Sequence, residues 1–179
     1  MRQRPKVSCF IATSLDGYIA GALGEIDWLF SDADYGYAAY YATVDTVLLG
    51  RGTYETALSF GDWPYSGKRA IILTNRPVRA LPDVEYRSGD VEALVEQLAH
   101  EGARHVWLVG GGDVVGQFRR AGLVDEWIIS IHPVLLGAGL PLFPHGLPRS
   151  SVEFTRHEVF PSGLVQVQYR TLDAADTVA

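Results

Sequence analysis

The chain has 179 residues, of which 47% are hydrophobic and 20% are charged, and its formal net charge is −6. This size and composition are typical of one globular domain with its own core, and the acidic balance argues against a nucleic-acid partner, which would need a basic face. Because the sequence shows no bilayer-length apolar run, no signal peptide and no basic block, we expect a cytoplasmic protein without a membrane partner.

Cysteine and histidine give no sign of a disulfide or a metal site. The only cysteine, Cys9, lies in an apolar run and has no partner for an internal disulfide, which fits a reducing compartment. The five histidines show neither H-x-H nor H-E-x-x-H spacing. The sequence therefore predicts no metal site.

The N-terminal part of the chain predicts a strand, a turn and a helix. Residues 7–13 are β-rich and indicate a buried strand, and Asp16-Gly17 is a strong turn signal before a short extended segment. Ser31 is expected to cap the first helix, with Asp32 and Asp34 in its first turn, where acidic groups complement the helix dipole.

From residue 46 onward, apolar strands alternate with helical patterns. The predicted strands cover 46–49, 70–73, 84–86, 106–109 and 127–131, and the predicted helices open at 53, span 90–101 and run from the glycines at 110–112 to 121. A glycine- and proline-rich loop follows over 133–148, then a hairpin of 152–160 and 164–169, and a loose tail. This order predicts a single α/β domain over 1–179, a three-layer α/β/α structure with a mostly parallel mixed sheet and an antiparallel C-terminal hairpin.

Three consecutive glycines, Gly110, Gly111 and Gly112, stand between the predicted strand and the helix that follows it. Such a turn can serve only close packing, or it can let a phosphate approach the backbone at the positive end of a helix. The spacing is not the G-x-G-x-x-G fingerprint, because Val115 occupies its last position, and no Gly-Lys-Ser/Thr of a P-loop follows. We favour phosphate binding.

Two other strand ends carry groups that suit a phosphate, Gly50-Arg51-Gly52-Thr53 and Thr74-Asn75-Arg76. The ends of parallel strands meet at one edge of a sheet, so these loops and the glycine turn can share one ligand. Arginine accommodates a 2′-phosphate, whereas an NAD site would favour an acid. Solvated loop charges are the alternative for both arginines, and with two threonines beside them we favour NADP.

These motifs resemble a known superfamily. The segments Gly50-Arg51-x-Thr53-x-Glu55, Ile71-Ile72-Leu73-Thr74 and Val109-Gly110-Gly111-Gly112 look like dihydrofolate reductase. Ser14-Leu15-Asp16-Gly17, residues 121–126 and the Pro133-x-Leu135-Leu136-Gly137-x-Gly139 motif look like the reductase domain of the bifunctional riboflavin-biosynthesis deaminase–reductase. The resemblance covers about residues 5–170. It implies a dihydrofolate reductase-like fold, NADPH as the cofactor and hydride transfer to a C=N-type bond of a pyrimidine- or pteridine-like molecule.

The resemblance also implies a set of cofactor-binding residues. Ala12 and Ile19 would border the nicotinamide, and Asp113 and Val115 depart from the dihydrofolate reductase pattern. The remaining expected residues would surround the phosphates and the adenosine end: Gly50, Arg51, Gly52, Thr53, Leu73, Thr74, Asn75, Arg76, Val109, Gly110, Gly111, Gly112, Asp113 and Val114.

On the substrate side, the resemblance implies a carboxylate on the first helix that holds the ring and helps to deliver a proton. Asp34 is the best positional match and Asp32 is the second candidate, although acids in a first turn can equally serve the helix dipole. The helix around Tyr35 and Tyr41 lacks the basic residue that a glutamate tail would need. The deaminase zinc signature is absent, which leaves only the reduction step.

We therefore predict a stand-alone NADPH-dependent reductase, most like 5-amino-6-(5-phosphoribosylamino)uracil reductase of riboflavin biosynthesis. A true dihydrofolate reductase and a non-catalytic NADP-binding protein are the alternatives. The apolar loop at 133–148 and the long hairpin predict a homodimer, as the resemblance to the riboflavin-pathway enzyme also suggests.

Overall fold

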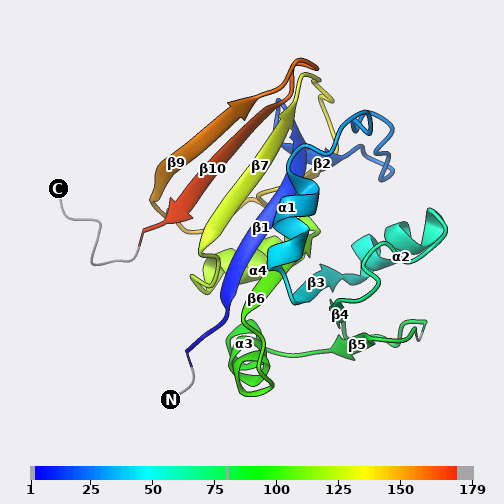
Figure 1. The fold of residues 1–179 in the computed structure, drawn as a ribbon, viewed down its shortest axis with the longest axis vertical. Helices are drawn as coiled ribbons and strands as arrows, with labels where there is room; N and C mark the ends of the chain where they lie inside the picture. Colours follow the sequence, from blue (N-terminus) through cyan, green and yellow to red (C-terminus); the bar gives the residue numbers. More distant parts are fainter. Residues whose placement is uncertain (1–2, 80, 173–179) are drawn as a thin grey trace.

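The computed structural model describes residues 3–79 and 81–172 and contains one large sheet, a two-stranded ribbon and four helices in these residues (Figure 1). The large sheet has the strand order β5-β4-β3-β6-β1-β7-β10-β9. The strands of this sheet are β1 (Lys6–Ser14), β3 (Thr46–Gly50), β4 (Arg69–Leu73), β5 (Val84–Arg87), β6 (His105–Gly110), β7 (Glu126–His132), β9 (Val152–Val159) and β10 (Val165–Thr171). The other elements are β2 (Tyr18–Ala20), β8 (Leu140–Pro141), α1 (Tyr37–Thr43), α2 (Arg51–Ser59), α3 (Val91–His100) and α4 (Gly112–Arg120).

Six neighbouring strands, from β5 to β7, run parallel, and the hairpin β9–β10 joins antiparallel to β7. The carboxyl ends of β3, β4, β6, β1 and β7 therefore lie along the same edge of the sheet. At that edge Gly50 is the Cα partner of Leu73, and Leu49 is the partner of Gly110. The predicted mixed sheet with its antiparallel hairpin is confirmed.

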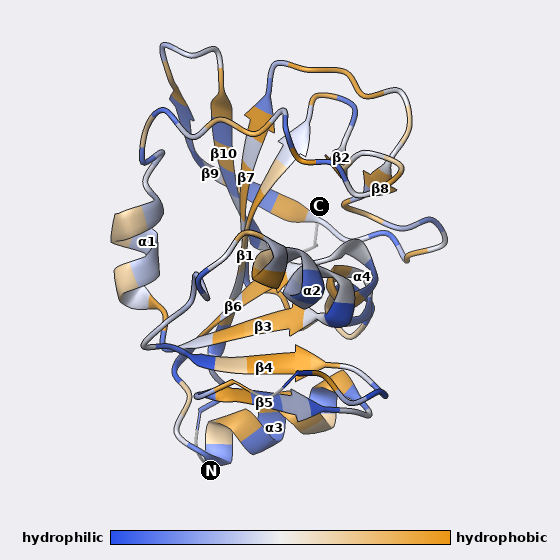
Figure 2. Cartoon of the chain, turned by 90° about the vertical axis from the view of Figure 1, so that its right-hand side faces the viewer, coloured by the Kyte–Doolittle hydropathy of each residue, from blue (hydrophilic) through white to orange (hydrophobic). Residues whose placement is uncertain are grey.

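Helices cover both faces of the parallel strands. Leu48 and Ile71 pack on one face in a core cluster that includes Phe118 of α4 and Leu98 of α3. On the other face, Val47, Leu49 and Ile72 pack with residues of α1 and α2, including the buried Tyr40 and Tyr54. Burial on both faces explains why β3 and β4 are continuous apolar runs, mostly orange in Figure 2, and it confirms the three-layer arrangement.

The predicted start of the first helix is wrong. Helix α1 begins at Tyr37, so Ser31, Asp32 and Asp34 precede the helix rather than forming its cap and first turn. The chain is interrupted by two left-handed residues, Tyr35 with φ 51° and Gly36 with φ 79°, which a continuous helix cannot contain. The carboxylate of Asp34 still accepts the backbone N–H of Ala38 at 3.0 Å, so it serves the helix from outside.

Two further boundaries differ from the prediction. Helix α2 begins at Arg51, directly after β3, so Gly52 and Thr53 belong to its first turn rather than to a loop. The loop at 133–148 contains the short strand β8, which pairs with β2. The expected loose tail lies outside the described residues from 173 onward. None of the helices in the described part of the chain has the length and apolar character needed to cross a membrane.

Candidate active site

The glycine turn lies at the junction of β6 and α4. Strand β6 ends at Gly110, whose φ of 126° favours glycine, and the next peptide, to Gly111, is cis. The Gly111 carbonyl accepts the N–H groups of Val114 and Val115 at 3.1 Å and so begins helix α4. Asp113 is exposed in the first turn of this helix, whereas Val114 is buried beneath it. The amino end of α4 therefore opens at the carboxyl edge of the sheet, as the sequence predicted.

Gly112 and Gly50 are closely surrounded, so a Cβ atom at either position would force a neighbour to move, whereas Gly111 has room for one. A Cβ atom at Gly112 would overlap the carbonyl oxygen of Pro141, and one at Gly50 would lie 2.9 Å from Val114 Cγ2. A Cβ atom at Gly111 would lie 3.4 Å from Thr53 Oγ1 and 3.7 Å from Ile19 Cδ1. The end of β3, the start of α2, strand β2 and the glycine turn are thus brought together at one place.

The end of β4 extends this edge. Thr74 Oγ1 accepts the backbone N–H of Arg76 at 3.1 Å and closes a small turn in which Asn75 and Arg76 are exposed. Arg51, in the first turn of α2, forms an ion pair with Glu55, with 2.6 Å between Nε and Oε1. Any anion that Arg51 binds must compete with this exposed pair, whose own contribution to stability is small.

The expected cofactor residues thus occupy one edge of the sheet, although their roles stay predictions. Val109 is the penultimate residue of β6 and packs against the core cluster that contains Tyr40 and Tyr54. Leu73 ends β4 beside Gly50. Ile19 is the middle residue of β2 and packs against the core cluster that contains Phe118 and Leu98. Gly52 faces open space, because a Cβ atom there would meet no atom within 4 Å.

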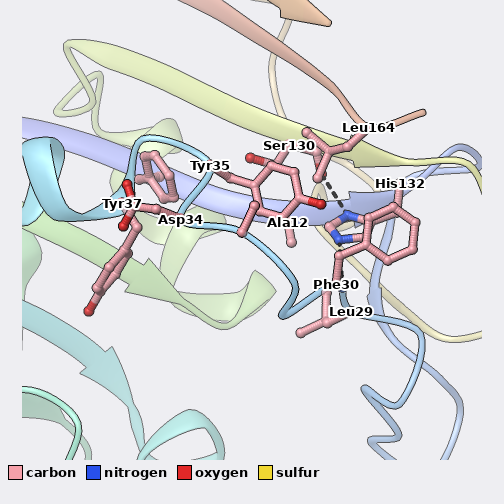
Figure 3. A pocket seen from close by; sticks show the side chains of 11 residues that line it. Ala12, Leu29, Phe30, Asp34, Tyr35, Tyr37, Ser130, His132 and Leu164 are labelled. Carbon is pink, nitrogen blue, oxygen red and sulfur yellow. Dashed lines mark hydrogen bonds between the residues drawn. The ribbon is translucent and has the colours of Figure 1, made fainter. Parts of the chain in front are cut away.

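A pocket of about 340 Å3 adjoins this edge on the face that carries α1. Figure 3 shows Tyr37 and Asp34 toward one end of it and His132, Phe30 and Leu29 toward the other, with Ala12 between. The lining is mostly apolar and aromatic: Phe10, Ala12, Leu29, Phe30, Ala33, Asp34, Tyr35, Tyr37, Ser130, His132 and Leu164. Strand β1 connects the two regions, because Ala12 lines the pocket while Ile11 Cδ1 would lie 3.4 Å from a Cβ atom at Gly110.

Buried polar side chains form the floor of the pocket. Gln166, 4% exposed, donates from Nε2 to Ser130 Oγ at 3.0 Å and to the Tyr35 carbonyl at 3.1 Å. Since Ser130 Oγ accepts this bond, its own hydrogen is available for donation to a ligand. His132 accepts the Phe30 N–H at Nε2 (3.2 Å), and its Nδ1 lies 3.2 Å from the Ser130 carbonyl oxygen. These bonds define a neutral tautomer with the proton on Nδ1.

The segment before α1 is fixed against the β9–β10 hairpin. The Tyr35 hydroxyl lies 2.6 Å from Asp32 Oδ1 and 3.0 Å from Ser162 Oγ, and its ring packs edge-on against Phe160 at 4.8 Å between centroids. The hydrogen bond to Asp32 raises the pKa of Tyr35, so the phenol keeps its proton. These contacts and the bond from Gln166 hold Tyr35 in its left-handed conformation.

Of the two acids predicted for the substrate side, the structure places only Asp34 on the pocket lining. Asp32 contacts the hydroxyl of Tyr35, whose ring is part of the wall. Ser130, His132 and Gln166, which shape the pocket, were not predicted from the sequence. A signal was present for Ser130 and His132, which are polar residues in the largely apolar strand β7, whereas Gln166 lies in a strand of alternating polar and apolar residues and gave none; all three are buried. Within the described residues, no group of three or more His, Cys, Asp or Glu side chains could hold a metal ion.

His132 makes the stability of the pocket sensitive to acid. Burial lowers the pKa of His132 below its ordinary value. The unfolded chain, with a histidine pKa of about 6.5, binds a proton before the folded chain does, so stability falls as the pH drops below that value. Between about pH 7.5 and about pH 5.5, the free energy of unfolding of the wild type is expected to fall by more than that of His132→Gln. Thermal or urea unfolding of both proteins measures this difference.

Comparing the wild type with His132→Gln isolates the contribution of His132 to the pH dependence of stability. Burial also lowers the pKa of His105, but His105 is present in both proteins and its contribution cancels in the difference. Parallel stability curves for the wild type and His132→Gln over this pH range would contradict the assignment of a neutral, bonded imidazole.

The chain matches a known family model and several known proteins. The model described as the RibD C-terminal domain matches residues 5–88 and 71–166. The chain is 38% identical to YwjB of Bacillus subtilis over 143 residues, 77% of this chain and 82% of YwjB. It is 30% identical to YyaP of the same organism, over 94% of this chain and 96% of YyaP. Both relatives are described as uncharacterized proteins.

Riboflavin biosynthesis protein RibD of Corynebacterium ammoniagenes is 28% identical over 81% of this chain, and the chain spans about half of that protein (48%). A solved structure described as a putative riboflavin biosynthesis protein from Shewanella superposes with a TM-score of 0.86 at 32% identity, covering 94% of this chain and 99% of that one. Dihydrofolate reductase of Enterococcus faecalis, solved with NADP(H), superposes with a TM-score of 0.69 at 17% identity and shares the fold, with coverage of 94% and 97%.

Proposed function

The chain belongs to the RibD C-terminal domain family, and from this premise we propose that it is an NADPH-dependent reductase acting on a pyrimidine- or pteridine-like ring. The reaction is most like that of 5-amino-6-(5-phosphoribosylamino)uracil reductase, an activity named for a Thermotoga maritima protein whose structure superposes with a TM-score of 0.73 at 21% identity, covering 94% of this chain and 57% of that one. A hydride adds to the carbon of a C=N-type bond of the substrate, and the nitrogen takes a proton.

One observation carries the proposal: strand β1 contributes to both regions, with Ile11 toward the glycine turn and Ala12 in the aromatic pocket. NADPH, when bound, supplies the hydride. The residues fit this cofactor, because the turn at Gly110-Gly111-Gly112 brings the amino end of α4, where phosphate is favoured, to the carboxyl edge of the sheet. Thr53 Oγ1, close to Gly111, adds a hydroxyl donor.

The pocket supplies the groups that a ring substrate needs. Phe30, Tyr35 and Tyr37 provide apolar faces for a planar ring. The Asp34 carboxylate accepts ring N–H or amino groups and can deliver a proton, directly or through water, while the Ser130 hydroxyl can donate to a ring carbonyl. Turnover of NADPH with a panel of aminated pyrimidines and pteridines tests the reaction, and binding of NADPH without oxidation on the whole panel would contradict it.

The cofactor part of the proposal predicts a preference for NADPH over NADH. If Arg76 contacts the 2′-phosphate, Arg76→Ala is expected to weaken NADPH binding about 10- to 100-fold, because a hydrogen bond to a charged group contributes roughly 1.5–3 kcal/mol. NADH binding should hardly change. Titration calorimetry of both cofactors measures this, and Arg51→Ala tests the second arginine in the same way.

Arg104→Ala is the matched control, because Arg104 is 89% exposed and lies before β6, at the opposite end of the parallel strands. It removes the same charge far from the expected cofactor site. Equal affinity of the wild type for NADH and NADPH would remove the basis for an NADP site.

We further propose that the chain forms a homodimer. All eight residues of the edge strand β9 are exposed, and large apolar side chains are exposed on it and in the 133–148 loop: Leu135, Leu140, Phe143, Phe154 and Val159. An unpaired edge strand with exposed apolar side chains on it and beside it is a candidate surface for pairing with a second copy of the chain. Light scattering is expected to give twice the chain mass, and a monomer mass at high micromolar concentration would overturn the proposal.

A further inference from the structure

The segments that enclose the pocket carry almost no positive charge. From residue 7 to residue 50 the chain has no Lys, Arg or His and six Asp or Glu residues, and this stretch includes β1 after its first residue, Lys6, the segment before α1 and α1 itself. The loop at 133–144 and the hairpin turn at 159–165 contain no charged residue. Ser130, His132 and Leu164 complete the lining.

The pocket lining carries one full charge, and it is negative. Asp34 lies on the lining, and Asp32 lies behind it at the hydroxyl of Tyr35. His132 is bonded as a neutral imidazole, because its Nε2 accepts the Phe30 N–H. Among the residues that the structure describes, the pocket lining therefore offers acidic and aromatic groups and a hydroxyl, and no lysine or arginine.

The nearby Lys68 does not add a positive charge to the pocket lining. Lys68 Nζ lies 4.6 Å from the centroid of the Tyr41 ring, and Tyr41 in turn stacks on Tyr37 at 5.4 Å. The ammonium group donates to the Val44 carbonyl at 2.6 Å, beyond the aromatic pair. The arginines that suit a phosphate, Arg51 and Arg76, follow β3 and β4 at the expected cofactor edge.

We propose that the substrate of this pocket is a planar, amino-substituted heterocycle that carries no phosphate, carboxylate or other anionic substituent. A phosphate monoester brings a charge of about −1.5 to −2, which needs cationic or N–H partners and is repelled by Asp34. The amino groups of the heterocycle match the Asp34 carboxylate, and its ring stacks between aromatic walls. This inference rests on the proposed function and narrows its substrate class to unphosphorylated molecules without a glutamate tail.

Matched ligand pairs that differ by one anionic group test the inference. The first pair is 5-amino-6-(5-phosphoribosylamino)uracil and the same compound after its phosphate is removed by a phosphatase. The second pair is a pterin with a 6-carboxylate and a pterin with a 6-hydroxymethyl group. In titration calorimetry with saturating NADP+, the uncharged member is expected to bind about 10-fold or more tightly than its anionic partner in at least one pair.

A variant with an added cation provides a gain-of-function test. Ala33 lines the pocket and is exposed, so Ala33→Lys places an ammonium group at the wall, and Ala33→Gln adds a comparable uncharged chain. Ala33→Lys is expected to shift the ratio of the two affinities in each pair about 10-fold toward the anionic member, whereas Ala33→Gln should leave that ratio unchanged.

The outcomes separate this inference from the proposed reaction. Equal or tighter binding of the anionic members by the wild type, or no binding of either member of both pairs, overturns the inference. If uncharged members bind but NADPH does not reduce them, the reductase proposal fails while the inference about the pocket stands. If the phosphorylated compound is reduced faster than its uncharged partner, the reaction stands and the inference falls.

Discussion

Replacing Gly112 with alanine is expected to lower the free energy of unfolding by about 1–3 kcal/mol, the usual cost of forcing a methyl group into a filled space. The Cβ atom would overlap the carbonyl oxygen of Pro141 in β8, and backbone cannot move aside as a flexible side chain can. For a chain of this length, such a loss corresponds to a decrease of roughly 2–12 °C in the melting temperature. Differential scanning calorimetry of the cofactor-free protein measures it.

The same substitution should also weaken NADPH binding. Strand β8 pairs with β2, so a displaced Pro141 moves the ribbon that carries Ile19 close to Gly111. The position of the expected nicotinamide wall therefore depends on the absence of a side chain at residue 112. We expect the loss of affinity for NADPH to accompany the loss of stability.

Gly52→Ala is the matched control for stability. Gly52 lies in the first turn of α2 and does not adopt a positive φ, and a Cβ atom added there would have no neighbouring atom within 4 Å. Alanine there favours the helix by about 0.5–1 kcal/mol, so the melting temperature should rise or stay constant. An unchanged melting temperature in Gly112→Ala, measured beside this control, would show that β8 yields easily and that the glycine is not required by packing.

The sequence was most informative where local chemistry decides the structure. Strands β3 and β4 are buried on both faces, so their apolar runs were continuous and easily recognised. Asp90 was recognisable at the start of α3, and its carboxylate accepts the N–H groups of Glu92 and Ala93. The glycine turn was also predictable, because few other residues allow such close approach of backbone segments.

Long-range contacts account for what the sequence did not reveal. Ser31 and Asp32 look like the start of a helix, yet the helix is delayed by the left-handed Tyr35, which is held by Gln166 and Ser162 from the distant hairpin. Strand β8 has two residues and exists only because it pairs with β2. No local pattern contains these contacts, so the start of α1 and part of the pocket wall could not be derived from the sequence.

The polar residues at the floor of the pocket were only partly predictable from the sequence. Ser130 and His132 interrupt the apolar strand β7, and a polar residue in a buried strand needs a partner or a ligand. The sequence thus marked their positions without naming their partners. Their hydrogen bonds with Gln166 and Phe30 come from β10 and from the segment before α1, and only the folded chain brings them together.

Asp34→Asn is expected to reduce NADPH-dependent turnover about 10²-fold or more, the usual scale for the loss of general acid–base catalysis. The substitution is selective because asparagine keeps a side-chain oxygen that can accept the Ala38 N–H, which Asp34 accepts at 3.0 Å. The start of α1 therefore remains capped, and the melting temperature should hardly change. What is lost is the negative charge and the exchangeable proton at the pocket wall. NADPH binding should also be nearly unchanged, because the expected cofactor residues lie at the glycine edge.

Asp32→Asn completes the test, because it changes the same group two residues earlier in the same segment. Asp32 contacts the Tyr35 hydroxyl rather than the pocket, and the asparagine oxygen can still accept that hydrogen bond. Steady-state kinetics on a substrate that the wild type reduces should therefore show a large decrease in kcat for Asp34→Asn and a small one for Asp32→Asn. The reverse order would move the proton-delivering role to Asp32. If both variants kept full activity, neither carboxylate would act in catalysis, and water alone would have to protonate the nitrogen of the reduced C=N bond.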